Sequence, residues 1–213
     1  MKLRERLREA LLYVIVDRRF EKRIDFPSLI PLLARAGVDI IQLREKRLNK
    51  AMLKEKAQLL RDLCRANNLL FIMNDYPELA AELDCDGVHV GGEDCSVLDA
   101  RKIVGEGKLV GWSARSIETA LRGEAAGADY LGVGAVFPTS TKRDAKMLSE
   151  IMLQRIANTV SIPVFAIGGI NSLNVARLIE LGIRRIAVCQ ALLEAEDIEK
   201  TARFLKMRLS ARI

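Results

Sequence analysis

The sequence has few of the residues on which acid–base and nucleophilic catalysis usually depend. It contains one histidine, His89, and its four cysteines show no CxxC spacing. Without a second histidine or a serine or cysteine partner, a hydrolase triad has no support. The cysteine pattern indicates neither a zinc site nor a disulfide framework. We therefore interpret His89 as structural and the cysteines as reduced thiols.

Aromatic residues and long apolar runs are also scarce. Only 5% of the 213 residues are aromatic, and no apolar run approaches the roughly 20 residues that span a bilayer. The segment from Met1 to Arg8 is too charged for a signal peptide, so we expect a cytoplasmic protein with no membrane partner. The net charge of +6 suits an anionic ligand. Because Lys and Arg are spread along predicted helices and little aromatic surface is available for base stacking, we expect a small phosphorylated ligand and no nucleic acid.

Apolar runs of strand length alternate along the chain with longer amphipathic segments, which is typical of βα units and a parallel sheet. Eight such units without a long linker favour one α/β domain over residues 1–213, a single-domain (β/α)8 TIM barrel. A doubly wound sheet is the alternative, but no GxGxxG motif follows the first strand. The strands are expected at Leu12–Val16, Asp39–Leu43, Leu69–Met73, Gly87–Val90, Leu109–Trp112, Tyr130–Gly134, Val164–Ile167 and Arg185–Cys189.

A short repeat supports this count. Predicted helices end in a glycine turn at Gly37, Gly127 and Gly182, and each turn leads into a strand. Glycine directly after the last helical turn is a common C-terminal cap. A helix at residues 3–11 is expected to cap the bottom of the barrel. The clearest other helices are predicted at Phe26–Ala36, Lys50–Ala66, Ile117–Ala126 and Ser172–Leu181.

In such a barrel the carboxyl ends of the strands form the functional face, so polar residues there are the candidates. At the end of the second strand, Gln42, Arg44 and Lys46 alternate and therefore share a face. Two cations and an amide indicate a site for an anionic group. An exposed helix start is the alternative interpretation of this charged run.

Two carboxylates follow neighbouring strands. Asp75, preceded by Asn74, ends the third strand, and Asp94 lies in the loop after the fourth. Since adjacent parallel strands lie about 4.8 Å apart, both carboxylates can place oxygens on one ion, and an oxygen-only site suits Mg²⁺. Asp94 could instead cap the following helix, but its partnership with Asp75 favours the metal site.

Candidates for phosphate binding follow the sixth and seventh strands. The sixth strand contains glycines and ends at Pro138, and Thr139, Thr141 and Lys142 come next, in the pattern of a phosphate grip. In the turn after the seventh strand, a glycine pair exposes backbone N–H groups at a helix N-terminus. Ser113, at the end of the fifth strand, is a weak signal, since serine more often caps a helix. The glycine pair is Gly168 and Gly169.

Together these residues resemble the thiamine phosphate synthase family, whose members join a pyrimidine diphosphate to a thiazole phosphate. The resemblance spans nearly the whole chain, and the order and spacing of the motifs make it specific. The motifs are Tyr13–Asp17, Gln42–Lys46, Asn74–Asp75, Asp86–Gly91 with Glu93–Asp94, Gly127–Lys142 and Ile167–Ile170.

The resemblance implies a transferase that condenses 4-amino-2-methyl-5-pyrimidinylmethyl diphosphate with 4-methyl-5-(2-phosphoethyl)thiazole, giving thiamine phosphate and diphosphate. Arg44, Lys46, Ser113 and Lys142 would be the catalytic residues. By the same resemblance, Gln42 and Ser113 would hold the aminopyrimidine, Arg44, Lys46, Asn74 and Lys142 the diphosphate, Asp75 and Asp94 Mg²⁺, and Thr139, Thr141, Gly168 and Gly169 the thiazole phosphate.

Two positions depart from the family pattern. Gln190 stands where a small serine is usual beside the thiazole phosphate, and the loop after Lys142 lacks the usual glycine. Gln190 could donate a side-chain amide there or crowd the site. The alternatives are a thiazole tautomerase of the sister family, or a non-catalytic regulatory or nucleic-acid-binding protein on the same barrel. The sequence leaves the oligomeric state open, with a homodimer as the commonest outcome.

Overall fold

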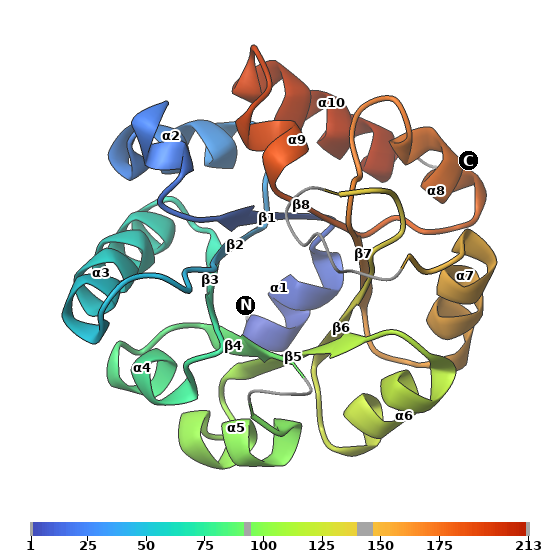
Figure 1. Cartoon of the computed structure of the whole chain (residues 1–213), viewed down its shortest axis with the longest axis horizontal. Coiled ribbons are helices and arrows are strands. Elements are labelled where there is room, and N and C mark those ends of the chain that lie inside the picture. Colours follow the sequence, from blue (N-terminus) through green and yellow to red (C-terminus); the bar gives the residue numbers. More distant parts are fainter. Residues whose placement is uncertain (1, 92–94, 140–146, 212–213) are drawn as a thin grey trace.

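Eight parallel strands pair in sequence order and close into a barrel, because β1 also pairs with β8. The protein is described by a computed structural model over residues 2–91, 95–139 and 147–211. Helices surround the strands in chain order (Figure 1). The (β/α)8 TIM barrel predicted from the sequence is therefore confirmed. The strands are β1 (Leu12–Val16), β2 (Ile40–Leu43), β3 (Leu70–Asn74), β4 (Gly87–Val90), β5 (Leu109–Ala114), β6 (Tyr130–Gly134), β7 (Val164–Ile167) and β8 (Ile186–Val188).

The helices begin at capping residues that the sequence supplies. Asp25 and Asn49, for example, accept a hydrogen bond from the backbone N–H three residues ahead, which satisfies one of the free donors of the first turn. Within the described residues the helices are α1 (Leu3–Glu9), the 3-10 helix η1 (Phe20–Lys22), α2 (Phe26–Arg35), α3 (Lys50–Ala66), α4 (Pro77–Glu82), α5 (Val97–Val104), α6 (Ile117–Ala125), α7 (Glu150–Thr159), α8 (Val175–Glu180), α9 (Gln190–Leu193) and α10 (Ile198–Ser210).

The helix C-termini follow the predicted glycine turns. Gly37, Gly127 and Gly182 have φ of +88°, +89° and +81°, a backbone conformation that glycine adopts without steric cost. Helix α8 starts later than predicted. Asn171 and Asn174 cause this difference, because their side chains accept backbone N–H groups of residues 171–174 and form a turn ahead of the helix.

Alternate strand residues fill two separate cores. On β1, Leu12, Val14 and Val16 pack in the layer between the strands and the helices, whereas Tyr13 and Ile15 fill the barrel interior. The period of two in a strand gives this division. Polar residues of the interior set therefore share the inside of the barrel.

Helix α1 covers the amino-terminal ends of the strands, and Figure 1 shows it across the centre of the barrel. Its Leu7 is part of the interior core. Arg4 forms an ion pair with Asp129, directly before β6, and Arg6 donates to the carbonyl of Asn68, two residues before β3. The interior therefore opens at the other end, where the strands finish.

Three aspartates fasten neighbouring strands at the amino-terminal end. Each directly precedes an even-numbered strand and accepts a backbone N–H from the strand before it, which satisfies a buried donor. We call these contacts the aspartate clasps. They join Asp39 Oδ2 to Leu12 N at 2.9 Å, Asp86 Oδ2 to Phe71 N at 2.8 Å and Asp129 Oδ2 to Val110 N at 2.8 Å.

Candidate active site at the carboxyl ends of the strands

The predicted residues of β2 and β3 meet at this end of the barrel. Gln42 is buried in β2 at 3% exposure. Two residues past the strand, Arg44 is hydrogen-bonded through its backbone N–H to the carbonyl of Val16 at 2.9 Å. The Nζ atom of Lys46 lies 3.3 Å from Oδ2 of Asp75. A cation and a carboxylate from adjacent strand ends are thus in contact.

Asn74 and Asp75 are held firmly. Asn74 is the last residue of β3 and is 6% exposed. Asp75 has φ of +64° and donates its backbone N–H to the carbonyl of His89 at 2.9 Å. Aspartate tolerates this left-handed conformation better than most residues. Because the Asp75 side chain is 14% exposed and that of Lys46 is 53% exposed, a ligand can reach the pair through the mouth of the barrel. By the mouth we mean the opening at the carboxyl ends of the strands.

Two buried carboxylates that the sequence did not single out shape the nearby loops. Glu45, at 5% exposure, accepts the backbone N–H groups of Arg18 at 3.3 Å and Arg47 at 3.1 Å. Asp17, at 8% exposure, forms an ion pair with Arg19 at 2.6 Å. Since their oxygens are occupied by neighbouring protein groups, we assign both to holding the loops after β1 and β2.

A hydrogen-bonded row of side chains crosses the barrel interior just below the mouth. Gln42 Nε2 donates to the Tyr13 hydroxyl at 2.7 Å, and the Tyr13 and Tyr130 hydroxyls are 3.0 Å apart. The Tyr130 hydroxyl lies 3.3 Å from Nδ1 of His89, whose Nε2 lies 2.9 Å from the Ser113 hydroxyl. Burial lowers the pKa of His89 to about 4. The ring is therefore neutral at pH 7, with one N–H and one bare nitrogen.

Two glycines provide the space for this row. A Cβ on Gly111 would lie 2.5 Å from Nδ1 of His89 and 2.4 Å from the Tyr130 hydroxyl oxygen, and one on Gly132 would lie 3.2 Å from the His89 ring. The participation of Tyr13, Tyr130 and His89 was not predicted from the sequence. Glycines at positions paired with His89 and Ser113 in the neighbouring strands are the signal that could have indicated it.

The loops after β6 and β7 pack against each other. Gly168 and Gly169 have φ of +100° and +64°. A Cβ on Gly168 would lie 2.5 Å from the Cβ of Ala135, and one on Gly169 would lie 2.3 Å from the carbonyl oxygen of Pro138. Thr139, the next residue, therefore follows a segment that packs directly against the glycine turn. Thr141 and Lys142 lie outside the described residues.

Gln190 is the first residue of α9, directly after Cys189. Its Nε2 donates to Oε2 of Glu194 one helical turn later, at 2.8 Å. Burial, followed by the charge of Asp17, raises the pKa of the Cys189 thiol to about 12. Cys189 is thus neutral, and the Gln190 side chain is engaged within its own helix.

Asp75 is the described residue of the predicted Mg²⁺ site. Asp94 lies outside the described residues, and the residues described contain no cluster of three or more His, Cys, Asp or Glu side chains that could hold a metal. Asp75 supplies a carboxylate at the mouth. Magnesium commonly binds one or two carboxylates together with substrate phosphates, so the donor chemistry of Asp75 fits this ion.

Comparison with known proteins agrees with this geometry. The family model described as thiamine monophosphate synthase matches residues 12–192. The chain belongs to this family. A thiamine-phosphate synthase of Clostridium acetobutylicum is 40% identical over 194 residues, covering 91% of this chain and 92% of that protein. One of Coprothermobacter proteolyticus is 39% identical over 207 residues, covering 97% and 98%. The thiamine phosphate pyrophosphorylase of Pyrococcus furiosus has a TM-score of 0.85, with 36% identity and 98% coverage of both chains.

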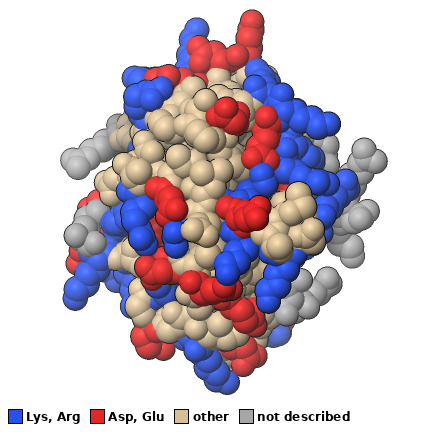
Figure 2. All heavy atoms as spheres, turned by 90° about the vertical axis from the view of Figure 1, so that its left-hand side faces the viewer, with Lys and Arg blue, Asp and Glu red and all other residues tan. Residues whose placement is uncertain are grey.

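Membership of the thiamine monophosphate synthase family makes the chain an enzyme of the transferase class, as expected from the sequence. On the face over α2, α3 and α4, Lys and Arg are intermingled with Asp and Glu (Figure 2). No helix in the described ranges has both the length and the apolar character to cross a membrane.

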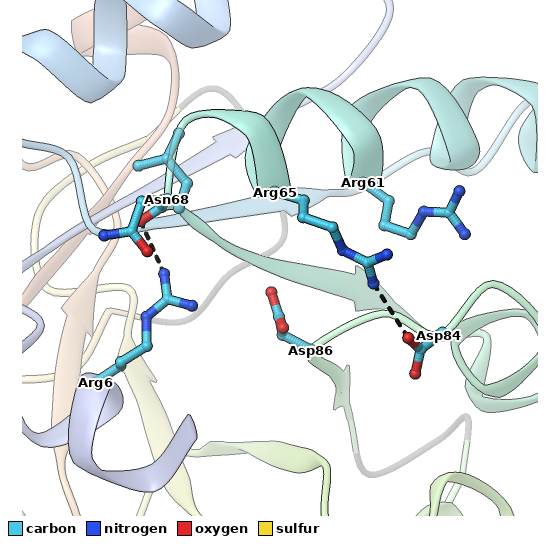
Figure 3. A pocket seen from close by; sticks show the side chains of 7 residues that line it. Arg6, Arg61, Arg65, Asn68, Asp84 and Asp86 are labelled. Carbon is cyan, nitrogen blue, oxygen red and sulfur yellow. Dashed lines mark hydrogen bonds and ion pairs between the residues drawn. The ribbon is translucent and has the colours of Figure 1, made fainter. Parts of the chain in front are cut away.

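A cavity of about 240 Å³ lies at the opposite end of this synthase-family barrel, beside the starts of β3 and β4. Figure 3 shows Arg6 and Arg65 directed toward Asn68 and Asp84. Arg61 donates to the carbonyl of Leu83 at 2.7 Å, and Arg65 pairs with Asp84 at 3.1 Å. Because these cations are already paired, we assign the cavity to bracing between α3 and the strand starts.

Proposed function

We propose that the chain condenses 4-amino-2-methyl-5-pyrimidinylmethyl diphosphate with 4-methyl-5-(2-phosphoethyl)thiazole, releasing thiamine phosphate and diphosphate. Family membership supports this reaction, and so does the layout of the mouth. One observation carries the proposal: two different arrangements whose chemistry suits an anion lie at the carboxyl ends of the strands, the Lys46–Asp75 pair beyond β2 and β3 and the glycine turn packed against the loop after β6.

The side of the mouth at β2 and β3 suits the pyrimidine diphosphate. Gln42 and Ser113 would hold the aminopyrimidine, because both reach the top of the interior and both can donate and accept hydrogen bonds. Arg44, Lys46 and Asn74 would bind the diphosphate, with Lys142 from the loop after β6. Guanidinium and ammonium groups make the strongest hydrogen bonds to phosphate oxygens.

Asp75 and Asp94 would hold Mg²⁺ beside this diphosphate. The ion would supply Lewis-acid neutralisation of the charge on the diphosphate oxygens. Lys46, 3.3 Å from Asp75, is placed to share a diphosphate oxygen once that carboxylate is occupied. The residues of the chain thereby orient the leaving group.

The side at β6 and β7 suits the thiazole phosphate. Backbone N–H groups of Gly168 and Gly169 would donate to its oxygens, since among the described residues no hydrogen-bond acceptor is found for either N–H. Thr139 and Thr141 would add hydroxyl donors, and Gln190 borders this region. The two substrates would then meet from opposite sides of one opening.

The reaction needs charge stabilisation rather than a general base. The electron-rich aminopyrimidine can stabilise a cation at its methylene carbon, so the diphosphate leaves first and the thiazole nitrogen then attacks that carbon. Arg44, Lys46 and Lys142 would stabilise the departing charge, and Ser113 would keep the ring in place. The neutral His89 ring fits this scheme, because no proton has to be removed from the thiazole nitrogen.

The direct test is incubation of the purified protein with both substrates and Mg²⁺, with analysis of products by chromatography and mass spectrometry. We expect thiamine phosphate and diphosphate in equal amounts. Interconversion of thiazole tautomers without either product would support the tautomerase alternative instead. Salt-sensitive binding to polynucleotides without turnover would support a non-catalytic barrel.

Asp75→Asn tests the division of the site. We expect kcat to fall by about 100-fold, because the amide cannot replace the charge of a metal-binding carboxylate, while the affinity for the thiazole phosphate changes by less than about twofold. The same expectation holds for Asp94→Asn. Steady-state kinetics and calorimetric titration measure the two quantities.

The matched control for this prediction is Asp84→Asn. Asp84 also has a positive φ, +53°, but lies at the amino-terminal end and pairs with Lys108 at 2.6 Å. We expect its kcat to equal that of the wild type. Equal losses of turnover and thiazole phosphate affinity in Asp75→Asn would contradict the proposed division.

Three expectations from the sequence stay predictions. Cytoplasmic location is expected from the charged N-terminal segment. A homodimer is expected because homodimers are the commonest oligomers. A single domain over residues 1–213 is expected because the composition shows no break. Fractionation of the source cells, light scattering and limited proteolysis would test them in turn.

A further inference from the structure

Five polar side chains from five strands form one continuous hydrogen-bonded row, which we call the interior chain. In order they are Gln42, Tyr13, Tyr130, His89 and Ser113, at successive separations of 2.7, 3.0, 3.3 and 2.9 Å. Tyr13 and Tyr130 are 2% and 1% exposed, whereas Ser113 is exposed at the mouth. The middle of the interior chain is therefore closed to bulk water, and one end meets it.

The direction of each hydrogen bond in the interior chain depends on the next one, because a hydroxyl has one proton and a neutral imidazole has one N–H. With Gln42 Nε2 as donor, the proton of Tyr13 points to Tyr130, and that of Tyr130 points to Nδ1 of His89. The ring proton is then on Nε2 and points to Ser113. Ser113 is left with a hydroxyl proton for a ligand, and Gln42 with its Oε1 acceptor.

The same heavy-atom positions allow the reverse direction. Ser113 then donates to Nε2 of His89, the ring proton moves to Nδ1, and the two tyrosine protons point toward Gln42, whose amide is turned so that Oε1 accepts. In this state Ser113 offers a lone pair and Gln42 offers an N–H. The direction of the interior chain therefore decides whether Ser113 can donate to a ligand and whether Oε1 of Gln42 is free to accept from one.

We propose that Tyr13, Tyr130 and His89 are positioning residues that couple Gln42 to Ser113. The hydrogen bonds that Gln42 and Ser113 form with the pyrimidine then depend on each other. This inference rests on the proposed function, in which both ends contact the aminopyrimidine. An aminopyrimidine has an amino donor beside a ring-nitrogen acceptor, which matches an acceptor on Gln42 and a donor on Ser113. Because the hydroxyl proton of Ser113 is available to a ligand only in the first direction, a ligand that accepts from Ser113 selects the direction in which Oε1 of Gln42 is free to accept the amino group.

The tautomer of His89 gives a direct test that does not depend on turnover. His89 is the only histidine, so ¹⁵N-labelled histidine reports a single ring. We expect the wild type to carry its proton mainly on Nε2. Tyr130→Phe removes the donor to Nδ1, and Tyr13→Phe removes the preceding link, so we expect each to lower the Nε2–H population by more than about twofold.

Phe165→Leu is the matched control, because Phe165 packs edge-on against Tyr13 and Tyr130 at ring-centroid distances of 5.5 and 5.7 Å but belongs to no hydrogen bond of the interior chain. We expect its tautomer population to equal that of the wild type. An unchanged tautomer in both tyrosine variants would overturn the proposal. So would a shift in Phe165→Leu as large as theirs, since the effect would then be one of packing.

Kinetics test whether the coupling reaches the substrate. Gln42→Met, Ser113→Ala and the double variant form a cycle on kcat/KM for the pyrimidine diphosphate. We expect the double variant to lose about 10-fold less than the product of the single losses, as for residues in one network. In the Tyr130→Phe background we expect no such coupling, so that the loss of kcat/KM in the double variant equals the product of the two single losses.

The outcomes separate the two proposals. Losses that multiply in the wild-type background, or coupling that persists in both Tyr130→Phe and Tyr13→Phe, would overturn the interior chain as the connection. A wild-type protein that forms no thiamine phosphate would overturn the proposed function instead, and the tautomer measurement would still decide whether the chain is coupled.

Discussion

Gly111 and Gly132 are the residues that admit polar side chains to the barrel interior. His89 is paired in register with Gly111, and Ser113 is paired with Gly132. A larger residue at position 111 would occupy the space of the Tyr130 ring and the His89 ring together. These glycines are therefore needed for their lack of a side chain, since neither has a positive φ.

Gly111→Ala should destabilise the protein by about 2 kcal/mol or more, because its Cβ would lie 2.2 Å from Cζ of Tyr130 and interior overpacking forces side chains from their rotamers. Gly107→Ala is the control: a Cβ there meets nothing within 4 Å, and surface changes of this kind stay within about 0.5 kcal/mol. Urea unfolding of both variants measures the difference. Equal stability of the two would show that the interior yields to the extra methyl group.

His89 is a residue whose orientation, but not whose partners, can be predicted from the sequence. The sequence predicts a structural role for this lone histidine without a serine partner, but the structure places Nε2 of His89 2.9 Å from the Ser113 hydroxyl. Its partners come from β5 and β6. The alternation of a strand tells which residues face inward, but it does not tell which of them meet across a closed barrel.

At the scale of the elements, the aspartate clasps link strands in pairs. Asp129 is the most heavily engaged: it accepts Val110 N and forms ion pairs with Arg4 and Arg101. The side chains of Asp129 and Arg101 are 8% and 10% exposed. Removal of this carboxylate would leave the buried Arg101 without its counter-ion, although its guanidinium also donates to the carbonyls of Gly105, Lys108 and Gly127, and it would leave a buried N–H without its acceptor.

Asp129→Ala should therefore lower the free energy of unfolding by about 3 kcal/mol, the usual result of breaking a buried ion pair from one side. Asp62→Ala is the comparison. Asp62 pairs with Arg61 at 2.6 Å but is 55% exposed, and exposed pairs contribute less than about 1 kcal/mol. Guanidinium unfolding curves give both values. A loss in Asp129→Ala no larger than in Asp62→Ala would contradict the role of the clasp.

The bounds of β1, β4, β6 and β7 were predicted from the sequence, because each is an apolar run between residues that favour turns. The start of α8 was not, since the decisive contacts are side-chain turns at Asn171 and Asn174. The same difference between strand pattern and side-chain contacts explains which parts of the candidate site could be predicted. Gln42, Lys46 and Asp75 could be placed at one mouth because parallel strands end together, whereas the loop contacts at Gly168 depend on packing that a sequence pattern does not encode.

At the scale of the whole molecule, the layer between barrel and helices controls thiol reactivity. None of the four cysteines, all within the described residues, forms a disulfide. Burial raises the pKa of Cys64, and it raises the pKa of Cys85 to about 12. Since the thiolate is the reactive form, little of either thiol is reactive at pH 8.

Native protein at pH 8 should expose one rapidly reacting thiol, the half-buried Cys95, to 5,5′-dithiobis(2-nitrobenzoate). The buried Cys64 and Cys85 should react only as the structure opens. The half-buried Cys189 should react slowly because the pKa of its thiol is raised to about 12, and all four should react at once in denaturant. The absorbance of the thiolate that the reagent releases gives the number of thiols that have reacted. Cys95→Ser should abolish the fast phase, and a remaining fast phase would show that one of the other three thiols reacts rapidly in the native state.

The two arginines before β8 connect the ends of the described chain to one place. Arg185 donates to the carbonyl of Arg8 at 2.8 Å, at the end of α1, and Arg184 donates to that of Leu209 at 3.1 Å, in the last turn of α10. Both chain ends are thus anchored at the face opposite the mouth. An affinity tag, a fluorescent fusion or a surface linker attached at either terminus would leave that mouth open, so the protein can be immobilised from either end with its substrate entrance turned to solution.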